Sequence, residues 1–269
     1  MLIIVDHRIK ETSLSALRSE GFQPLLMPPA NYLSDAVSSH TDMLIFLGFG
    51  RLFCHKRYYE SNASLIDYIC ETAALTLTLS DEATGDRYPE DVLFNACIVG
   101  NRLICNERTI SKLILASARE LGYEIIHVSQ GYTKCSICKI SESAIITSDK
   151  AIAAACASAK IDVLQICEGH ISLPPYEYGF IGGASGIWQD KVYFCGSLSA
   201  HPDGEKIEEF CKKHGKIAVS LSDGELQDVG SCYFIEESLS TDFENGNTAW
   251  KKSAYFYRDF INSIRNRGK

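Results

Sequence analysis

A short sequence pattern recurs five times along this chain and constrains the fold more than any other feature. Each copy opens with small or polar residues and continues as an apolar strand pattern, at 39–46, 94–99, 133–140, 182–188 and 229–235. The copies follow one another about every 50 residues, a period typical of repeated supersecondary units. An ordinary doubly wound sheet does not repeat in this way, so we expect a chain built from five similar units.

The same order of elements is expected in each unit. After a short turn, four of the opening strands are followed by a second strand, at 51–54, 102–105, 144–147 and 191–195. Two strands joined by so short a turn predict a hairpin. A helical pattern and a further strand come next, most clearly at 109–123 and 124–128. The predicted unit is therefore strand, strand, helix, strand.

The fifth unit lacks its second strand, and the N-terminus supplies a match. Residues 1–5 resemble the second strands of the other units and are followed by a helical pattern at 13–20 and a strand at 23–27. We predict that residues 1–5 pair with the segment after Val229, which closes the units into a ring without exposed sheet edges. An amphipathic helix at about 248–267 is expected to pack outside the ring. Because no linker interrupts the pattern, residues 1–269 are expected to form a single domain.

Composition indicates the cellular compartment of the protein and the class of partner that it binds. The first residues lack the basic flank and apolar run of a signal peptide, and no stretch reaches the roughly 18 apolar residues of a membrane span. The eleven cysteines are odd in number and lie mostly in apolar patterns, which favours reduced, buried thiols and a cytoplasmic location. The net charge of -8 disfavours nucleic acid and anionic membranes as partners and suits a small cationic molecule.

Five units of this kind, with the N-terminus completing the last, resemble the guanidino-group-modifying enzymes. This is the pentein or five-bladed β/α-propeller family, which includes arginine deiminases, dimethylarginine dimethylaminohydrolases, agmatine deiminases and amidinotransferases. The resemblance covers about residues 1–237 and implies an α/β fold whose blades surround a central channel. It also implies a cysteine-dependent hydrolase of carbon–nitrogen (non-peptide) bonds, or an amidinotransferase, acting on a guanidino, amidino or amino-acid-like compound without a metal or other cofactor.

Catalysis in that family uses a cysteine on the last opening strand, a His-x-Asp motif and an acidic Glu-Gly-Gly-Asp-like motif. Cys232 resembles the cysteine position, and His40 and Asp42 resemble the His-x-Asp motif. The nearest counterpart of the acidic motif, at 181–185, keeps the glycines and lacks both carboxylates. His40 lies in the first unit and not in the one before the cysteine, although closure of the ring would place the first and last units side by side.

Attack on a guanidinium carbon requires a thiolate, an acid for the departing amine, and carboxylates that hold the planar cation. We therefore predict three catalytic residues: Cys232 as nucleophile, His40 as acid and base, and Asp42 as a carboxylate that, like Asp228, holds the guanidinium. Cys135 is a second candidate nucleophile, because neighbouring Lys134 would lower its thiol pKa. The residues expected to bind substrate are Asp228, Gly183, Ser185, Lys134, Cys135 and Asn95.

These residues also have structural interpretations. Cys232 lies in an apolar pattern typical of a buried structural thiol, which is the favoured interpretation for that residue taken singly. His40 and Asp42 either share one face of a strand or form a turn with a side-chain cap. The glycines at 182–186 either let a ligand approach the backbone or, as we favour, relieve crowding of strands at the axis.

Two further alternatives concern metal binding and catalysis. Cys135 and Cys138 have Cys-x-x-Cys spacing, but no second pair with zinc-ligand spacing is present, so no metal site is predicted. A non-catalytic protein of the same fold, which acts by binding, is the alternative to an enzyme. The missing acidic motif favours that alternative.

Overall fold

The computed structural model describes residues 1–237 of the 269-residue chain; the helix predicted at about 248–267 lies outside them. The described strands form five three-stranded sheets and one two-stranded sheet. In every three-stranded sheet the middle strand pairs antiparallel with one neighbour and parallel with the other. The strands, sheet by sheet, are β17 (Tyr233–Ile235), β1 (Leu2–Asp6) and β2 (Gln23–Met27); β3 (Ile45–Gly48), β4 (Arg51–His55) and β5 (Thr76–Ser80); β6 (Cys97–Val99), β7 (Arg102–Cys105) and β8 (Glu124–His127); β9 (Cys138–Ser141), β10 (Ala144–Thr147) and β11 (Asp162–Gln165); β13 (Ser185–Trp188), β14 (Lys191–Phe194) and β15 (Ile217–Ser220); and the pair β12 (Ile171–Ser172) and β16 (Leu226–Gln227).

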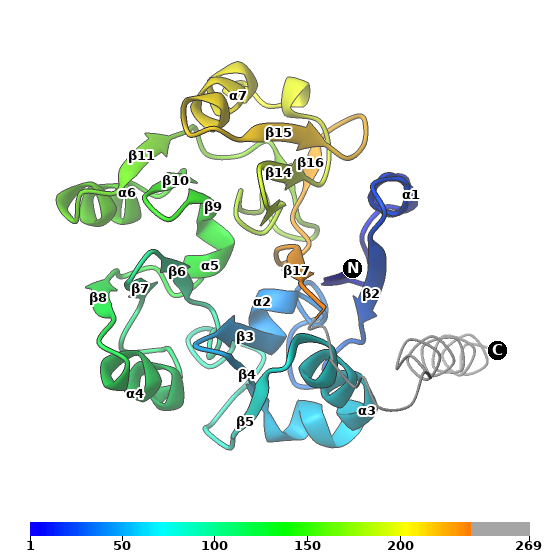
Figure 1. The fold of residues 1–269 in the computed structure, drawn as a ribbon, viewed down its shortest axis with the longest axis vertical. Coiled ribbons are helices and arrows are strands. Elements are labelled where there is room, and N and C mark those ends of the chain that lie inside the picture. The colour runs from blue at the N-terminus through cyan, green and yellow to red at the C-terminus, as the bar shows by residue number, and fades with distance from the viewer. Residues whose placement is uncertain (238–269) are drawn as a thin grey trace, which may run out of the picture.

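A helix joins the middle strand of each three-stranded sheet to its parallel partner, because parallel strands cannot be connected by a tight turn. These helices lie at the periphery in Figure 1, and the sheets lie around a common centre. They are α1 (Glu11–Ser19), α3 (Lys56–Ala73), α4 (Lys112–Glu120), α6 (Lys150–Ser158) and α7 (Gly204–Lys213), with a short 3-10 turn, η1 (Leu198–Ala200), before α7. None of the helices in the described part of the chain has the length and apolar character needed to cross a bilayer.

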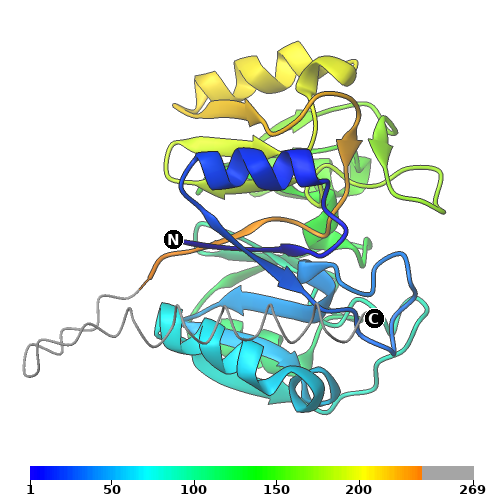
Figure 2. The same cartoon turned by 90° about the vertical axis from the view of Figure 1, so that its right-hand side faces the viewer.

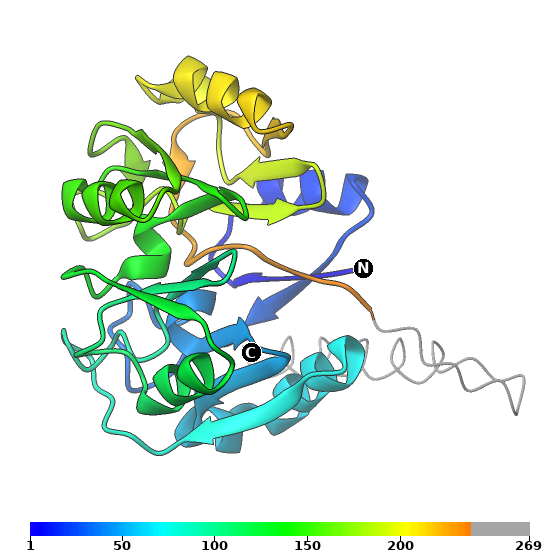
Figure 3. The ribbon, with the colours of Figure 1, turned by 60° about the vertical axis from the view of Figure 1, so that its left-hand side comes forward.

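The two ends of the described chain meet in one sheet. Strand β1 pairs antiparallel with β17, with Leu2 opposite Ile235 and Ile4 opposite Tyr233. Figures 2 and 3 show these segments side by side through the middle of the molecule. All residues of β1 are buried. The predicted pairing of residues 1–5 with the segment after Val229 is therefore confirmed.

Two of the opening segments differ from the prediction. Residues predicted as the starts of strands form single helical turns, α2 (Thr41–Leu44) and α5 (Thr133–Ser136), directly before β3 and β9. His40 is the N-cap residue of α2, and its side chain makes no capping hydrogen bond. Neither the shared strand face nor the side-chain cap expected for His40 and Asp42 is therefore present. Both turns lie near the centre of Figure 1. Side chains of the two turns meet there, since Cys135 Sγ donates to Asp42 Oδ2 at 3.2 Å.

The cysteines fit the sequence analysis. All eleven are free, and all except Cys167 are buried. The buried cysteines lie in the apolar clusters of the core, where they pack as small side chains, and Cys135 also contacts polar groups.

Burial of β1 can be tested with two strand isoleucines. Ile4 on β1 is fully buried, whereas Ile217 on β15 is 53% exposed. We expect Ile4→Ala to lower the free energy of unfolding by about 2–5 kcal/mol, because it leaves a cavity between packed sheets. The control, Ile217→Ala, should lower it by about 1 kcal/mol or less. Urea titrations measure both, and equal losses would contradict the buried position of β1.

Candidate functional site

A cluster of buried polar side chains lies where segments from four of the three-stranded sheets meet. We call it the central cluster. Its members come from the end of β1, from α2, from the segment before β6, from α5 and from the segment between β16 and β17. The members are Asp6, His40, Asp42, Asn95, Lys134, Cys135, Asp228 and Ser231. All except half-buried Lys134 are at most 4% exposed.

His40 lies between two carboxylates. Its Nε2 is 3.7 Å from Asp6 Oδ2, and its Nδ1 is 3.9 Å from Asp228 Oδ1. Both distances exceed hydrogen-bond length, and neither ring nitrogen has a hydrogen-bond partner among the described residues. A buried polar group without a partner costs free energy. The imidazole is therefore free to bind a further group with either nitrogen.

Asp42 is engaged through one oxygen. Its Oδ2 accepts hydrogen bonds from Ser231 Oγ at 2.7 Å and from Cys135 Sγ at 3.2 Å. Lys134 Nζ donates to Ser231 Oγ at 2.7 Å, so the ammonium reaches Asp42 only through the serine hydroxyl. The other oxygen, Oδ1, is buried and has no partner within residues 1–237. Asp42 therefore keeps an acceptor available.

Asp6 has a cationic partner of its own. Arg8 donates to it from the backbone N–H at 2.7 Å and from Nε at 3.0 Å, and Ser39 Oγ adds a bond at 2.9 Å. Burial by itself would raise the pKa of Asp6, but the hydrogen bonds and charge of Arg8, with the charge of His40, hold that pKa below its ordinary value. Asp6 therefore stays ionised.

Asp228 is held by backbone donors instead. Its Oδ1 accepts from Gly230 N at 3.0 Å and its Oδ2 from Phe180 N at 2.8 Å. Burial raises the pKa of Asp228, and the charge of Asp42 raises it further, while His40 and the two backbone donors act in the opposite direction. A positive charge placed beside Asp228 would therefore favour its ionised form.

Glycines let the backbone pack directly against these groups. A Cβ at Gly183 would overlap the Asp228 carboxylate, and one at Gly182 would overlap backbone carbonyl oxygens of α5. Gly230 has a φ of +63°, and a Cβ there would overlap His40. Ser185 lies in the same crowded region, where its Oγ donates to Gly182 O at 3.3 Å. The structure thus supports crowding as the reason for the glycines at 182–186.

The two candidate nucleophiles lie in different surroundings. The thiol of Cys232 lies 3.4 Å from that of Cys195, in an apolar group with residues of β1 and α1. Cys135 belongs to the central cluster. Burial raises its thiol pKa well above the ordinary value, and the Asp42 and Asp228 carboxylates raise it further. The prediction that Lys134 gives Cys135 a low pKa is therefore wrong.

Ser231 was missed by the sequence analysis. Its φ of +70° follows the left-handed Gly230, and this turn directs the Ser231 hydroxyl to Asp42 while the next side chain, Cys232, contacts Cys195. Counting the repeat from Asp42 in the first opening segment leads to Ser231 and not to Cys232 in the last, so the position could have been found from the repeat, although the direction of its side chain depends on the left-handed turn. Among the predicted residues, the structure brings His40, Asp42, Asp228, Lys134, Cys135 and Asn95 together.

Asn95 ties the cluster to α5. Its Oδ1 accepts from the backbone N–H groups of Lys134 and Cys135, at 2.7 and 3.2 Å. Its Nδ2 lies 3.1 Å from Cys135 Sγ and 3.2 Å from the backbone oxygen of Asp42. Asn95 therefore fixes α5 relative to α2 and orients the thiol of Cys135.

Two groups of described residues have the side chains to hold a metal ion. In each group three potential ligand atoms lie within 4.8 Å of one another. One group is His40, Asp42 and Cys135 in the central cluster, and the other is Cys167, His201 and Asp203. Neither group was predicted from the sequence.

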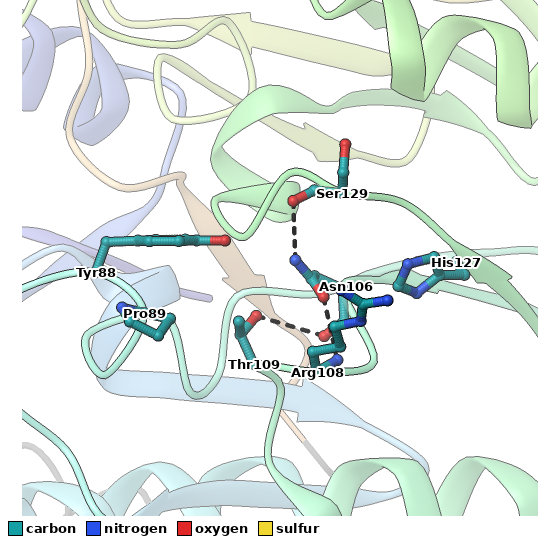
Figure 4. A pocket seen from close by; sticks show the side chains of 7 residues that line it. All are labelled: Tyr88, Pro89, Asn106, Arg108, Thr109, His127 and Ser129. Atoms are coloured by element: carbon teal, nitrogen blue, oxygen red, sulfur yellow. Dashed lines mark hydrogen bonds between the residues drawn. The ribbon is translucent and has the colours of Figure 1, made fainter.

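A separate surface pocket of about 490 Å³ lies at the C-terminal ends of strands β7 and β8 (Figure 4). It is lined by Tyr88, Pro89, Asn106, Arg108, Thr109, His127 and Ser129. None of the predicted site residues lines it. Its guanidinium, imidazole and hydroxyl groups are suited to an anion and not to the cationic ligand predicted from the charge of the chain.

A protein-family model described as a family of unknown function (DUF6873) matches residues 4–233. The chain belongs to this family. A search of curated proteins gave no match.

Solved structures show which fold this DUF6873 member has. A cysteine-to-serine variant of dimethylarginine dimethylaminohydrolase from Pseudomonas aeruginosa, complexed with citrulline, is 9% identical, with a TM-score of 0.54 over 82% of this chain and 91% of that chain. An agmatine deiminase from C. jejuni is 9% identical, with a TM-score of 0.52 over 82% and 87% of the two chains. The amidinotransferase SxtG from Microseira wollei is 10% identical, with a TM-score of 0.52 over 80% and 74%. All three are pentein guanidino-modifying enzymes, so the resemblance expected from the repeats is confirmed, and at this identity it concerns the fold.

The pH dependence of stability tests the Asp6–Arg8 pair. Because the folded-state pKa of Asp6 is below its unfolded value, the pair stabilises the fold above about pH 4 and is lost as the pH falls through the folded-state pKa. We expect the unfolding free energy of the wild type to fall more steeply between about pH 5 and pH 2 than that of Asp6→Asn. The exposed control, Asp81→Asn, should keep the wild-type slope. Parallel curves for the wild type and Asp6→Asn would show that the pair is not formed.

Proposed function

We propose that this chain binds a small cationic compound of guanidino or amidino type in the central cluster. Three buried carboxylates, those of Asp6, Asp42 and Asp228, gather around His40, and this observation carries the proposal. Of these three carboxylates only that of Asp6 pairs directly with a guanidinium among the described residues, that of Arg8. A bound cation would offset the remaining negative charge.

A guanidinium ion suits these acceptors chemically. It is planar and presents N–H donors in a fork, which carboxylates accept in pairs of charge-assisted bonds. Asp42 Oδ1 has no competing donor within the described chain, and the Asp228 carboxylate lies 3.9 Å from His40 Nδ1. The three solved enzymes that share this fold support the same class of compound, since their names refer to dimethylarginine, agmatine and amidino transfer.

The proposal also covers the architecture of the molecule and its location. We take the five three-stranded sheets as the blades of a five-bladed β/α propeller around the central cluster, because each has the same pairing of strands. Residues 1–269 would form a single domain, since β1 and β17 join the two ends of the described chain in one sheet. Eleven free cysteines support a cytoplasmic location, because that compartment keeps thiols reduced.

Binding without chemistry is the function that the geometry supports best. Ser231 and not Cys232 binds Asp42, and the Cys232 thiol faces Cys195. The cysteine that does contact Asp42 is Cys135, and burial together with the Asp42 and Asp228 charges raises its thiol pKa well above the ordinary value. The second candidate is a hydrolase or amidinotransferase with Cys232 as nucleophile and His40 and Asp42 as its partners. The free nitrogens of His40 beside two carboxylates favour it, since such an imidazole can carry a proton to a leaving amine.

Calorimetry with agmatine, arginine and citrulline tests the proposal. We expect the wild type to bind the cationic agmatine or arginine and to bind citrulline, whose ureido group is neutral, more weakly. Asp42→Asn and Asp228→Asn should each weaken binding about tenfold or more, because each removes a charge-assisted acceptor. The exposed control Glu205→Gln should bind like the wild type. Failure of the wild type to bind either cationic compound would refute the proposal.

An activity assay separates the two candidates. Release of ammonia or transfer of an amidino group by the wild type, abolished in Cys232→Ala, would establish the enzyme. Cation binding without turnover, unchanged in Cys232→Ala, is the result expected here.

A further inference from the structure

We propose that His40, Asp42 and Cys135 bind a divalent transition-metal ion of the zinc type in the central cluster. Ligand atoms of these three residues lie within 4.8 Å of one another, and all three side chains are buried. The proposal goes beyond guanidino binding and does not rest on it, because it depends only on donor atoms that the chain itself brings together.

The donor set selects the class of metal. An imidazole nitrogen, a carboxylate oxygen and a cysteine sulfur are the ligands that zinc uses in proteins. The sulfur ligand disfavours magnesium and calcium, which prefer oxygen. Three protein ligands would leave one tetrahedral position open, as in catalytic and not structural zinc sites.

The donor atoms are available without breaking an ion pair. Both nitrogens of His40 and the Oδ1 of Asp42 have no hydrogen-bond partner in the part of the chain that the structure describes. The thiol of Cys135 donates to Asp42 Oδ2 at 3.2 Å. When the ion binds, a metal–sulfur bond forms and the thiol proton is released to solvent. The thiolate and the Asp42 carboxylate then balance the two positive charges.

A second layer of contacts orients these ligands. Asn95 Nδ2 donates to Cys135 Sγ at 3.1 Å, and Ser231 Oγ donates to Asp42 Oδ2 at 2.7 Å. Metal-bound histidines usually donate their other ring N–H to a carboxylate or carbonyl group. His40 has a carboxylate near each nitrogen, Asp6 at 3.7 Å and Asp228 at 3.9 Å, so either nitrogen can ligate while the other donates.

The second group of potential ligands differs in its contacts. Asp203 Oδ1 already accepts from Lys206 Nζ at 2.6 Å, and Asp203 Oδ2 accepts from Cys167 N at 2.8 Å. His201 Nδ1 accepts from Asp203 N at 3.1 Å, and Cys167 is exposed. This group has the same residue types without the free, buried carboxylate oxygen, so Cys167→Ser is a matched control for Cys135→Ser.

Metal titrations of the full chain test the proposal. The protein is stripped with EDTA, desalted and titrated separately with Zn²⁺ and Co²⁺. We expect one equivalent of each to bind, and the Co²⁺ form to show a sulfur-to-metal charge-transfer band together with tetrahedral visible bands. Cys135→Ser should lose the charge-transfer band, and Cys135→Ser and His40→Ala should each bind Zn²⁺ at least tenfold more weakly. Cys167→Ser should match the wild type, and Asn95→Ala should weaken binding about 10- to 100-fold.

Two results would overturn the proposal. One is a wild-type protein that binds neither ion stoichiometrically, and the other is a charge-transfer band that persists in Cys135→Ser and disappears in Cys167→Ser. If Cys135→Ser fails to fold by circular dichroism, the wild type alone decides. It should then release about one proton from its thiol per Zn²⁺ bound, and a Co²⁺ spectrum without a sulfur band would refute cysteine ligation. Guanidino binding is measured with EDTA present, so either proposal can fail while the other stands.

Discussion

The antiparallel pairing of β1 with β17 is the interaction on which the rest of the structure depends. It places the end of β1, with Asp6, beside the segment 228–231 that leads into β17. That segment in turn binds α2, since Asp42 N donates to Gly230 O at 3.0 Å. Asp6, Asp42 and Asp228 are far apart in sequence, and without this pairing nothing would bring Asp6 close to the other two in space. With it, they surround one buried imidazole.

Gathering carboxylates away from water is unfavourable unless donors or cations compensate. Arg8 compensates Asp6 directly, backbone N–H groups compensate Asp228, and Lys134 compensates Asp42 through the hydroxyl of Ser231. This compensation leaves acceptors of Asp42 and both nitrogens of His40 without partners among the described residues. A cluster arranged in this way is more typical of a binding site than of a structural core. Both the cationic ligand and the metal ion proposed above would complete it.

Sequence patterns predicted the hairpins, the helices that follow them and the pairing of residues 1–5 with the last unit. They did so because alternating and helical apolar periods persist over whole elements. They did not predict α2 and α5. A single helical turn of four residues is too short to show a helical period, so these segments read as continuations of the strands that follow. The consequence is local, because His40, Asp42 and Cys135 still face the centre, from helical turns and not from strands.

Side-chain direction and depth of burial were the harder quantities. A left-handed φ at Gly230 is common for glycine, but the same conformation at Ser231 is uncommon for serine. The residue types therefore did not predict that the side chain of Ser231, and not that of Cys232, points to Asp42. The pKa of the Cys135 thiol is raised by burial and by the charges of Asp42 and Asp228, neither of which is next to it in sequence. A double-mutant cycle between Asp42→Asn and Ser231→Ala tests the shared cluster most directly, because 189 residues separate the two partners in sequence. The structure predicts a coupling of about 1 kcal/mol or more in the free energy of unfolding, whereas changes that add to within about 0.3 kcal/mol would contradict it.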